Sequence, residues 1–315
     1  MKTPTAVFQL LLGFCVLIIV SACINSTTQG VSPSVTANNP DNTQTRSASS
    51  SPMVSTPTVE PSITFTPLPS LTPSPLPQVL STLPPATAQA AVLDLTNNNR
   101  GCRLPCWWGF TPGETSWQTA QSFLATVALA IKKGSSAERP LYSVYFVVPK
   151  EVFSTTLTHN YKVVDGIIER IEVIPGHTSV YSLSTFLNTY GPPDEVWIRT
   201  YNEAREGDLP FDTVLFYPRQ GILARYDSQA NKVVDKIVGC PQQDPALVLA
   251  LWSPKQELDF VEATNLTVEI RNEDWWPYRP LEEATGIDID VFYQTFQKSN
   301  TSSCLETPAN LWPQP

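Results

Sequence analysis

Two histidines, together with serines and cysteines, are the residues of this chain that could do hydrolytic chemistry. A nucleophilic hydrolase needs a serine or cysteine beside a base, and a third group must orient that base. The histidines are His159 and His177, and both lie in polar stretches that we expect to be loops. No nucleophile-elbow sequence lies near either one. We therefore interpret both as solvated loop histidines, and a hydrolase is the least favoured class.

Carboxylates offer a second route to chemistry, but their spacing favours helix capping. Glu282 and Glu283 fall in the first turn of one predicted helix, and Asp288 or Asp290 can cap the next. Asp288 and Asp290 alternate but lack the glycine and final glutamate of a calcium loop. The chain has no glycine-rich nucleotide-binding motif and no H-E-x-x-H pattern. We expect no cofactor. Glycoside hydrolysis stays open, because its two carboxylates can be far apart in the sequence and close together in the fold.

Cysteine chemistry begins near the N-terminus, where Cys23 follows a short apolar segment. Lys2 precedes an apolar run of about 15 residues, Ala6 to Val20, which suits a signal-peptide core and is short of a membrane span. The sequence of Val20–Cys23, V-S-A-C, resembles the lipobox of bacterial lipoproteins. The resemblance implies cleavage before Cys23, attachment of diacylglycerol to its thiol and acylation of its new amine.

The lipobox resemblance implies a membrane anchor with the mature protein outside the cytoplasm. Acyl chains contribute ~0.8 kcal/mol per buried CH₂, so two or three chains hold a protein firmly where one holds it reversibly. Ile24 stands where an aspartate would resemble an inner-membrane retention signal, and the choice between inner and outer membrane stays open. Ordinary secretory cleavage and an uncleaved anchor helix are the alternatives.

Four cysteines follow the anchor, and an even number in an exported domain favours disulfides. We predict the pair Cys102–Cys106, which closes the loop CRLPC, and the pair Cys240–Cys304. The second pair pins the end of the chain to the main sheet and closes a loop with a model entropy of about 4 kcal/mol. A zinc site is the alternative, although C-x-x-x-C with one distant pair and two histidines is weak metal spacing. We expect no metal.

Aromatic residues are the feature most suggestive of ligand binding. Trp107 and Trp108 follow Cys106 directly, and the stretch EDWWPYRP holds Trp275, Trp276 and Tyr278. Flat apolar rings with one polar atom are what a sugar ring or a proline-rich peptide stacks on. Adjacent strand residues face opposite sides, so at most one tryptophan of each pair is free. The alternative is that one tryptophan of each pair fills a core edge while the other packs against the disulfide or a proline.

A change of composition separates the anchor from the domain. After a signal peptide at residues 1–22, we predict that residues 23–97 are the lipidated cysteine and a disordered tether rich in Ser, Thr and Pro. Closely spaced prolines remove amide donors and favour extended conformations. Such a tether reaches roughly 50 Å when flexible. Whether it is O-glycosylated stays open.

Residues 98–178 are predicted to form a first unit of one helix and antiparallel strands. Thr115 or Ser116 can cap a helix whose apolar positions recur at helical spacing from Trp117 to Ile131. Strand-like runs follow at residues 141–149 and, after an Asp165-Gly166 turn, at residues 166–175. The imperfect alternation of the last run indicates a bulge or a buried stretch.

Residues 179–240 are predicted to repeat this plan. Ser182 can cap a short helix that Gly191 ends, and strands follow at residues 194–201, 211–218 and 221–229, with YPRQG as the last hairpin turn. This helix and meander pattern resembles the β-lactamase-inhibitor-protein-like fold over residues 109–239. The chain also resembles uncharacterised bacterial lipoproteins. The resemblance to uncharacterised lipoproteins implies no function. An inhibitor role does not carry over from the other resemblance, because no binding-loop residue matches.

The predicted fold is therefore α+β, with two tandem helix-plus-meander units and a C-terminal helical extension at residues 241–315. Within this extension, ALVLALWSP is a candidate for a buried strand and PKQELDFVEA for a short helix. The chain holds 20 basic and 29 acidic residues, a net charge of −9, so a nucleic acid partner is excluded. We expect a non-catalytic binding or protein-interaction module of the cell envelope, with binding of a cell-wall glycan through exposed tryptophans as the alternative. Tryptophans in a shared groove would favour a ligand, and a flat apolar sheet face would favour a protein partner.

Overall fold

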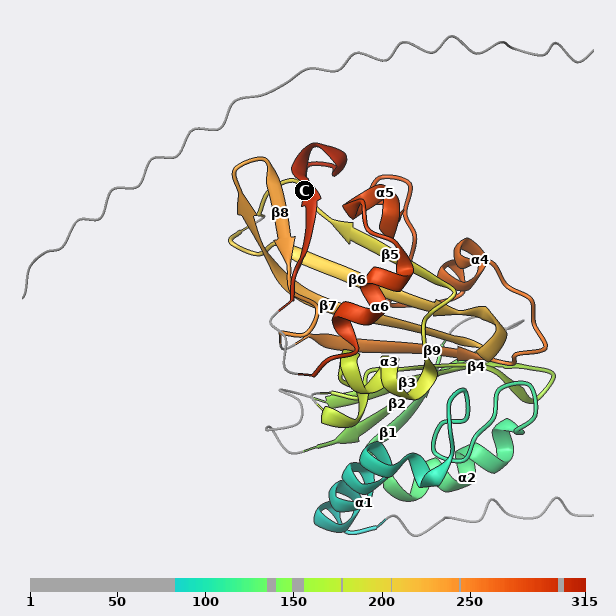
Figure 1. The fold of residues 1–315 in the computed structure, drawn as a ribbon. Coiled ribbons are helices and arrows are strands. Elements are labelled where there is room, and N and C mark those ends of the chain that lie inside the picture. The colour runs from blue at the N-terminus through green and yellow to red at the C-terminus, as the bar shows by residue number, and fades with distance from the viewer. Residues whose placement is uncertain are drawn as a thin grey trace, which may run out of the picture. The chain divides into compact units, whose positions relative to one another are not determined.

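Antiparallel strands dominate the part of the chain that the structure describes, and helices pack on the sheet that they form (Figure 1). The computed structural model describes residues 83–134, 140–148, 156–176, 178–204, 206–243, 245–299 and 303–315, which all belong to one unit. Residues 1–82, with Cys23 and most of the predicted tether, lie outside the described residues, as does His177. The α+β class is confirmed.

The sheet has eleven described strands, and nine of them follow the order β1-β2-β3-β4-β9-β7-β6-β5-β10, while β8 pairs with β7 and β11. Each pairing is antiparallel. The strands are β1 Ala130–Lys133, β2 Leu141–Val147, β3 Thr156–Val164, β4 Ile167–Val173, β5 Glu195–Thr200, β6 Pro210–Tyr217, β7 Ile222–Val233, β8 Lys236–Gly239, β9 Ala246–Trp252, β10 Arg279–Pro280 and β11 Leu305–Pro308. This sheet is larger than either predicted meander.

The first meander, β1 to β4, follows helix α2, Trp117–Val127. Ser116 caps this helix, since its hydroxyl accepts a hydrogen bond from the Thr119 amide at 3.2 Å. The predicted extension of the helix to Ile131 is wrong, because the helix ends at Val127 and Ile131 lies in β1. The Asp165-Gly166 turn is confirmed, and the predicted bulge appears between β3 and β4.

Strand β3 corrects the prediction that His159 lies in a loop. Its burial alternates along its length, and its inward residues are Leu157, His159, Tyr161 and Val163. Histidine and tyrosine are intermediate in polarity, so the alternation of buried residues in this segment is visible only when both are counted as core residues. Otherwise the segment looks polar. His159 has no exposed surface.

The second meander, β5 to β7, follows helix α3, Leu183–Tyr190. Ser182 caps this helix, and Gly191 follows it at a positive φ of 81°, as predicted. The turn YPRQG is confirmed between β6 and β7, where Gly221 adopts a φ of 67° and lies against the backbone of Trp252. A side chain at Gly221 would collide with that backbone, so the turn requires glycine.

The C-terminal segment 241–315 is not a separate helical extension, which corrects that prediction, because it contributes a strand to the main sheet. Its strand β9 lies in the centre of the sheet and joins the two meanders by pairing with β4 and β7. The sequence ALVLALW is continuously apolar because both faces of this strand are covered. The predicted helices follow it as α4 Phe260–Asn265, α5 Leu281–Thr285 and α6 Ile289–Phe296, and Asp288 caps α6.

The sheet has a hydrophobic core on each face. The larger core takes side chains from α2, α3, α5 and α6, for example Leu124, Phe186, Leu281 and Phe292. The smaller core lies under α4, whose Phe260 packs with residues such as Phe216 and Trp252. Asp212 lies two residues from Val214 of this core, on the same face of β6, so charged side chains border the core there.

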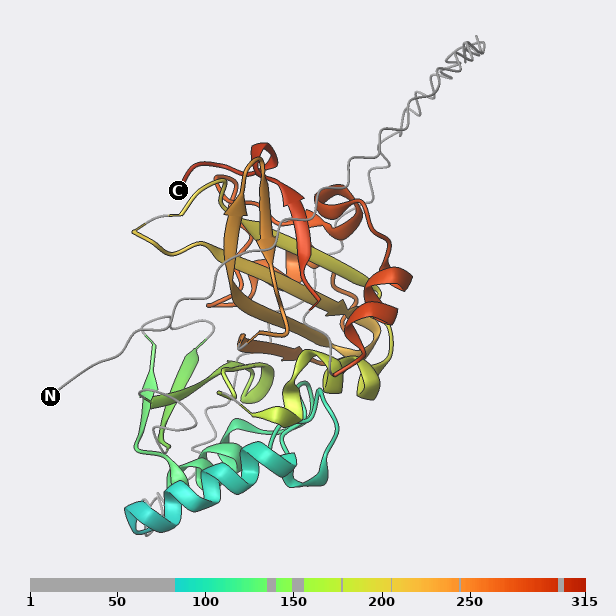
Figure 2. The ribbon, with the colours of Figure 1, turned by 60° about the vertical axis from the view of Figure 1, so that its left-hand side comes forward.

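Helix α1, Pro85–Asn98, corrects the end of the predicted tether. Pro85 occupies the first helical position, where no amide donor is needed, and the alanine-rich sequence that follows favours a helix. Val92 and Leu95 are buried in the larger core, so this segment has the apolar face that the proline-rich stretch lacks. Figure 2 shows α1 beside α2 along the β1–β3 part of the sheet.

Both predicted disulfides are confirmed. Cys102 pairs with Cys106 in the loop after α1, and Cys240 pairs with Cys304. The second bond links the residues next to the β8–β11 pairing, where Leu305 lies opposite Gly239. It therefore fixes the C-terminal strand to the sheet, as predicted.

Candidate functional site

Trp107 and Trp108 are fully buried, which corrects the expectation that one indole of this pair could face a ligand. Asn99 organises their loop, because its side chain donates to the Cys102 and Cys106 carbonyls and accepts from the Trp108 amide at 2.6 Å. Both indoles pack around His159, with ring centroids 5.6 and 4.5 Å away. They are core residues of the first meander.

His159 lies in this aromatic cluster and not in solvent. Burial lowers its pKa from the ordinary 6.5 to about 3, so the ring stays neutral over the physiological range. Its Nδ1 lies 3.3 Å from the Tyr161 hydroxyl, and its Nε2 has no hydrogen-bond partner among the residues that the structure describes. With no exposed surface, the imidazole has no route to a substrate in this conformation.

The other three aromatic candidates come together in the loop between α4 and β10, above β5, β6 and β7. Trp275 and Trp276 line a pocket of about 330 Å³ that we call the arginine–tryptophan pocket. Its lining residues are Arg199, Pro210, Asp212, Arg225, Asp227, Val268, Glu269, Arg271, Glu273, Trp275 and Trp276. Tyr278 lies beneath it, because its hydroxyl donates to Asp212.

Arg199 and Asp212 form the floor of the pocket. They are opposite each other on β5 and β6, with 5 and 3 % of their side chains exposed. Arg199 donates from Nε and Nη2 to Asp212 Oδ2, at 3.0 and 2.6 Å. The Tyr278 hydroxyl donates to the same oxygen at 3.0 Å, and burial together with the Asp212 charge raises the Tyr278 pKa well above its ordinary value. Oδ2 of this carboxylate therefore accepts three hydrogen bonds, while Oδ1 lies 3.8 Å from Arg225 Nε.

The Arg199 guanidinium also stacks against two rings. Its Cζ lies 3.8 Å from the ring centroid of Trp276 and 4.0 Å from that of Tyr278, distances at which cation–π attraction is strong. Trp276 further stacks on Tyr201 at 4.4 Å, and its indole donates to the Thr200 carbonyl. Trp276 and Tyr278 thus hold the loop on the sheet and have little surface left for a ligand.

Arginines of the sheet and one glutamate hold the pocket's loop through its backbone. Arg199 donates to the Arg271 carbonyl and Arg225 to the Glu269 carbonyl, both at 2.7 Å. From β4, the Glu172 carboxylate accepts a hydrogen bond from the Val268 amide at 2.8 Å. These bonds fix the pocket wall even though residues 266–278 contain no helix or regular strand.

Arg225 and Asp227 form the more open side of the pocket. Asp227 lies opposite Asp212 in the β6–β7 pairing and is 36 % exposed, with its Oδ2 3.9 Å from Arg225 Nη2. Burial and the nearby Asp212 charge raise the pKa of Asp227 to about 6 despite both arginines. Its carboxyl group can therefore change charge near neutral pH.

Trp275 is the member of the five aromatic candidates that faces solvent. Its side chain is 60 % exposed at the pocket, and its ring centroid lies 5.9 Å from that of Trp276. The pocket therefore combines one exposed indole face with guanidinium donors and carboxylate acceptors. Such a wall can stack on the face of a small polar ring while hydrogen-bonding its substituents.

The charged members of the pocket were missed at the sequence level, whereas its aromatic members were found. Arg199, Asp212, Arg225 and Asp227 stand on strands that otherwise carry mainly buried apolar residues. Arg225 and Asp227 alternate in ARYD, so both point to one face. Charged residues at alternate positions of a buried strand were the available signal.

Comparisons with known proteins add no relative. No family model matches the chain, and searches of curated proteins and of solved structures find no significant match. Within the described ranges, no group of three or more His, Cys, Asp or Glu side chains could hold a metal ion. A search of the same ranges finds no helix with the length and apolarity needed to cross a membrane.

Proposed function

We propose that this protein is an extracytoplasmic lipoprotein, anchored in the cell membrane through Cys23, whose domain is a non-catalytic binding module. The V-S-A-C sequence at Val20–Cys23 supports the anchor. The two disulfides support an oxidising compartment, because such bonds persist outside the cytoplasm. Residues 24–82, rich in proline, serine and threonine, then serve as the tether.

The fold supports a tandem arrangement of two related units. Helix α2 precedes the meander β1–β4, and α3 precedes the meander β5–β7, in the same order along the chain. Under this proposal the two units derive from one β-lactamase-inhibitor-protein-like plan. Strand β9, contributed by the C-terminal segment, then seals the junction between them.

The ligand that fits the arginine–tryptophan pocket is a sugar unit of a cell-wall glycan. A single observation carries this choice: the Trp275 indole is exposed beside a pocket lined by arginine and carboxylate side chains. An indole face stacks on the C–H surface of a sugar ring, and charged groups bind its hydroxyls by strong, directional hydrogen bonds. The volume of about 330 Å³ suits one or two rings.

A binding role fits the carboxylates better than a catalytic role. Glycoside hydrolysis needs two carboxyl groups that are free to act on the substrate. Asp212 is committed to Arg199 and to Tyr278, which leaves Asp227 as the accessible carboxyl group next to it. Asp212 is therefore not free to act as the second acid beside Asp227, and the other lining carboxylates, Glu269 and Glu273, lie on the loop between α4 and β10.

The anchor is tested by intact-mass measurement on membrane-extracted protein beside a Cys23→Ala variant. The proposal predicts a mass that lacks residues 1–22 and carries acyl chains, and both features are lost in the variant. A mass that includes residues 1–22, or a mature protein without acyl chains, would refute the anchor.

The ligand is tested by calorimetric titration with chito-oligosaccharides and with solubilised cell-wall glycan. Trp275→Ala should weaken binding at least tenfold, Trp275→Phe should recover most of the affinity, and the thermal midpoint should change little because the side chain is exposed. Leu129→Ala, which truncates an exposed apolar side chain outside the pocket, is the matched control. Equal binding by wild type and Trp275→Ala would exclude this pocket as the glycan site.

A further inference from the structure

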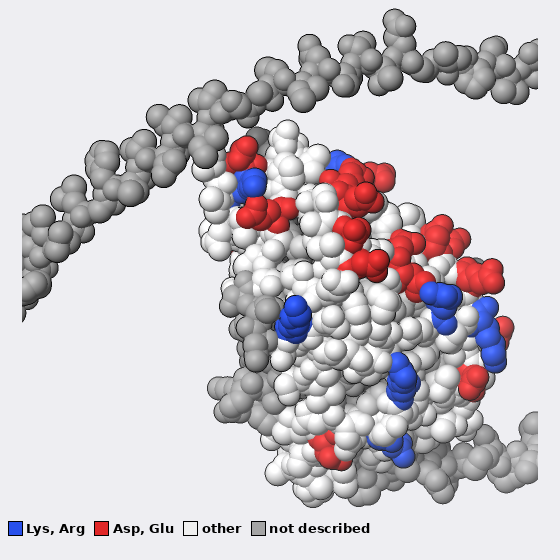
Figure 3. Space-filling view, viewed as in Figure 1, with Lys and Arg blue, Asp and Glu red and all other residues white. Residues whose placement is uncertain are grey.

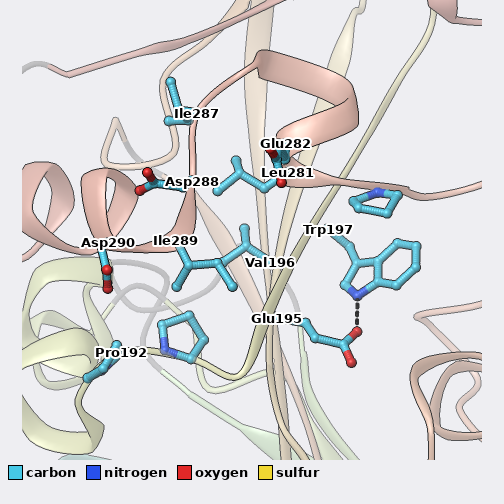
Figure 4. Close-up of a pocket in the computed structure, with 12 residues that line it drawn as sticks. Pro192, Glu195, Val196, Trp197, Leu281, Glu282, Ile287, Asp288, Ile289 and Asp290 are labelled. Carbon is cyan, nitrogen blue, oxygen red and sulfur yellow. Dashed lines mark hydrogen bonds between the residues drawn. The ribbon is translucent and has the colours of Figure 1, made fainter. Parts of the chain in front are cut away.

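A groove of about 860 Å³ lies beside β5, between that strand and the segment that joins α5 to α6 (Figure 4). Twelve residues line it: Pro192, Pro193, Glu195, Val196, Trp197, Pro280, Leu281, Glu282, Ile287, Asp288, Ile289 and Asp290. None of them lines the arginine–tryptophan pocket. The groove is therefore a separate surface.

The groove crosses the edge of β5. Val196 is buried in the larger core and Trp197 packs against the smaller one, so these neighbours point to opposite faces of the strand. A groove that touches both side chains must pass over the strand edge between them. Strand β10 pairs with Ile198 and Trp197 alone, so among the described strands none covers this edge at Glu195 and Val196.

The floor of the groove is apolar. Val196, Leu281, Ile287 and Ile289 supply aliphatic side chains, and Figure 4 shows Val196, Leu281 and Ile289 gathered at its centre. Trp197 forms one wall of the groove and is held in place, since its indole donates to Glu195 Oε2 at 2.7 Å and stacks on Phe260 at 4.1 Å. The floor and this wall are thus preformed.

The rim of the groove is acidic. Glu195, Glu282, Asp288 and Asp290 line it, and no lysine or arginine does. None of these four carboxylates takes part in an ion pair of the described residues. Figure 3 shows acidic side chains gathered on the part of this face where Figure 1 places α5 and α4.

We propose that this groove binds an extended segment of a partner protein in which apolar residues alternate with lysine or arginine. The segment adds to the open edge of β5 through its backbone, its apolar side chains enter the floor, and its cationic side chains meet the rim carboxylates. Strand addition of this kind takes affinity from backbone hydrogen bonds and specificity from alternate side chains. Charge complementarity selects a cationic partner.

Charge also argues against the two occupants that this chain could supply. The segment between Cys23 and residue 83 contains one basic residue, Arg46, against Asp41 and Glu60. A second copy of the chain brings a net charge of −9 to an acidic rim. The negative charge of either occupant would be repelled by the rim carboxylates, whereas a cationic segment would be attracted to them.

The test is fluorescence anisotropy with the full-length protein and a labelled octapeptide of alternating lysine and valine. We expect saturable binding that weakens as salt rises, and a weakening of about tenfold in Glu282→Gln/Asp290→Asn. The control variant Asp165→Asn/Glu203→Gln removes two exposed carboxylates away from the groove and should bind as wild type does. Amide hydrogen exchange of residues 194–198 should slow when the peptide binds.

Several outcomes would overturn the proposal. One is equal binding of an alternating glutamate–valine peptide, and another is an equal loss of affinity in the control variant. A third is found without peptide: amides of residues 194–198 that are protected from exchange in the wild type and unprotected in the groove variant. The tether or a second copy would then already occupy the groove. Trp275→Ala should leave peptide binding unchanged, so failure of the glycan proposal and failure of this one are distinguishable.

Discussion

Arg199 and Asp212 face each other across the β5–β6 pairing, and two guanidinium nitrogens donate to the same carboxylate oxygen, at 3.0 and 2.6 Å. Both side chains are almost completely buried. The same pair supports the pocket loop, because Arg199 also donates to the Arg271 carbonyl and Asp212 accepts from Tyr278. Stability and pocket shape therefore depend on one ion pair.

Removing one partner of this pair should cost more unfolding free energy than removing both. Asp212→Asn leaves the Arg199 charge buried beside a neutral amide, and the expected loss is about 3 kcal/mol of unfolding free energy. The double variant Arg199→Met/Asp212→Leu should recover at least part of that loss, since no unpaired charge then remains at Arg199. Urea unfolding of the two variants measures both values. A double variant less stable than Asp212→Asn would contradict this account.

Asp227→Asn should stabilise the protein above pH 6 and change little near pH 4. The pKa of Asp227 is about 6 in the folded state and 3.8 in the unfolded state, so the carboxyl group ionises first in the unfolded state. The wild type therefore loses stability as pH rises from about 4 to about 6. Because the side chain is about one-third exposed, solvent screening limits the gain to about 1 kcal/mol. Urea unfolding from pH 4 to 8 measures the difference, with Asp165→Asn in an exposed turn as the control. A difference that shrinks with rising pH would be inconsistent with a raised pKa.

His159→Phe should make the protein less sensitive to acid. The folded pKa of about 3 lies below the ordinary 6.5, so the stability that neutral His159 contributes is present above pH 6.5 and is lost as pH falls towards 3. At 1.36 kcal/mol per pH unit, the variant should gain roughly 2–3 kcal/mol on the wild type between pH 7.5 and 4.5. Equilibrium unfolding at these two pH values gives the comparison. Parallel acid profiles would show that His159 is accessible to protons in the folded state.

Local signals in the sequence predicted the elements that depend on neighbouring residues. Ser116, Ser182 and Asp288 cap helices as predicted, and the Asp165-Gly166 turn forms where two strand-like runs meet. In each case a side chain bonds to a backbone amide three residues away or a turn residue supplies its own conformation. Distant contacts were not needed to identify them.

Elements that depend on distant contacts could not be predicted in the same way. The apolar run of β9 indicated a buried strand, but its place between β4 and β7 follows from pairings with segments tens of residues earlier. The candidate site shows the same division. Trp275 was found from its residue type, whereas Arg199 and Asp212 became part of the site through a cross-strand register that no local pattern encodes.

Loss of the disulfide Cys240–Cys304 should cost more stability than loss of Cys102–Cys106. The first closes a loop with a sequence separation of 64 and the second a loop with a separation of 4. The chain-entropy relation then gives about 4 kcal/mol for the first and about 2 kcal/mol for the second. Paired Cys→Ser variants compared by chemical unfolding without reductant measure both losses, and full reduction of the wild type should cost more than either variant alone. An equal loss in the two variants would mean that the bond Cys240–Cys304 does not act mainly on the unfolded chain, and that the β8–β11 pairing holds the C-terminus without it.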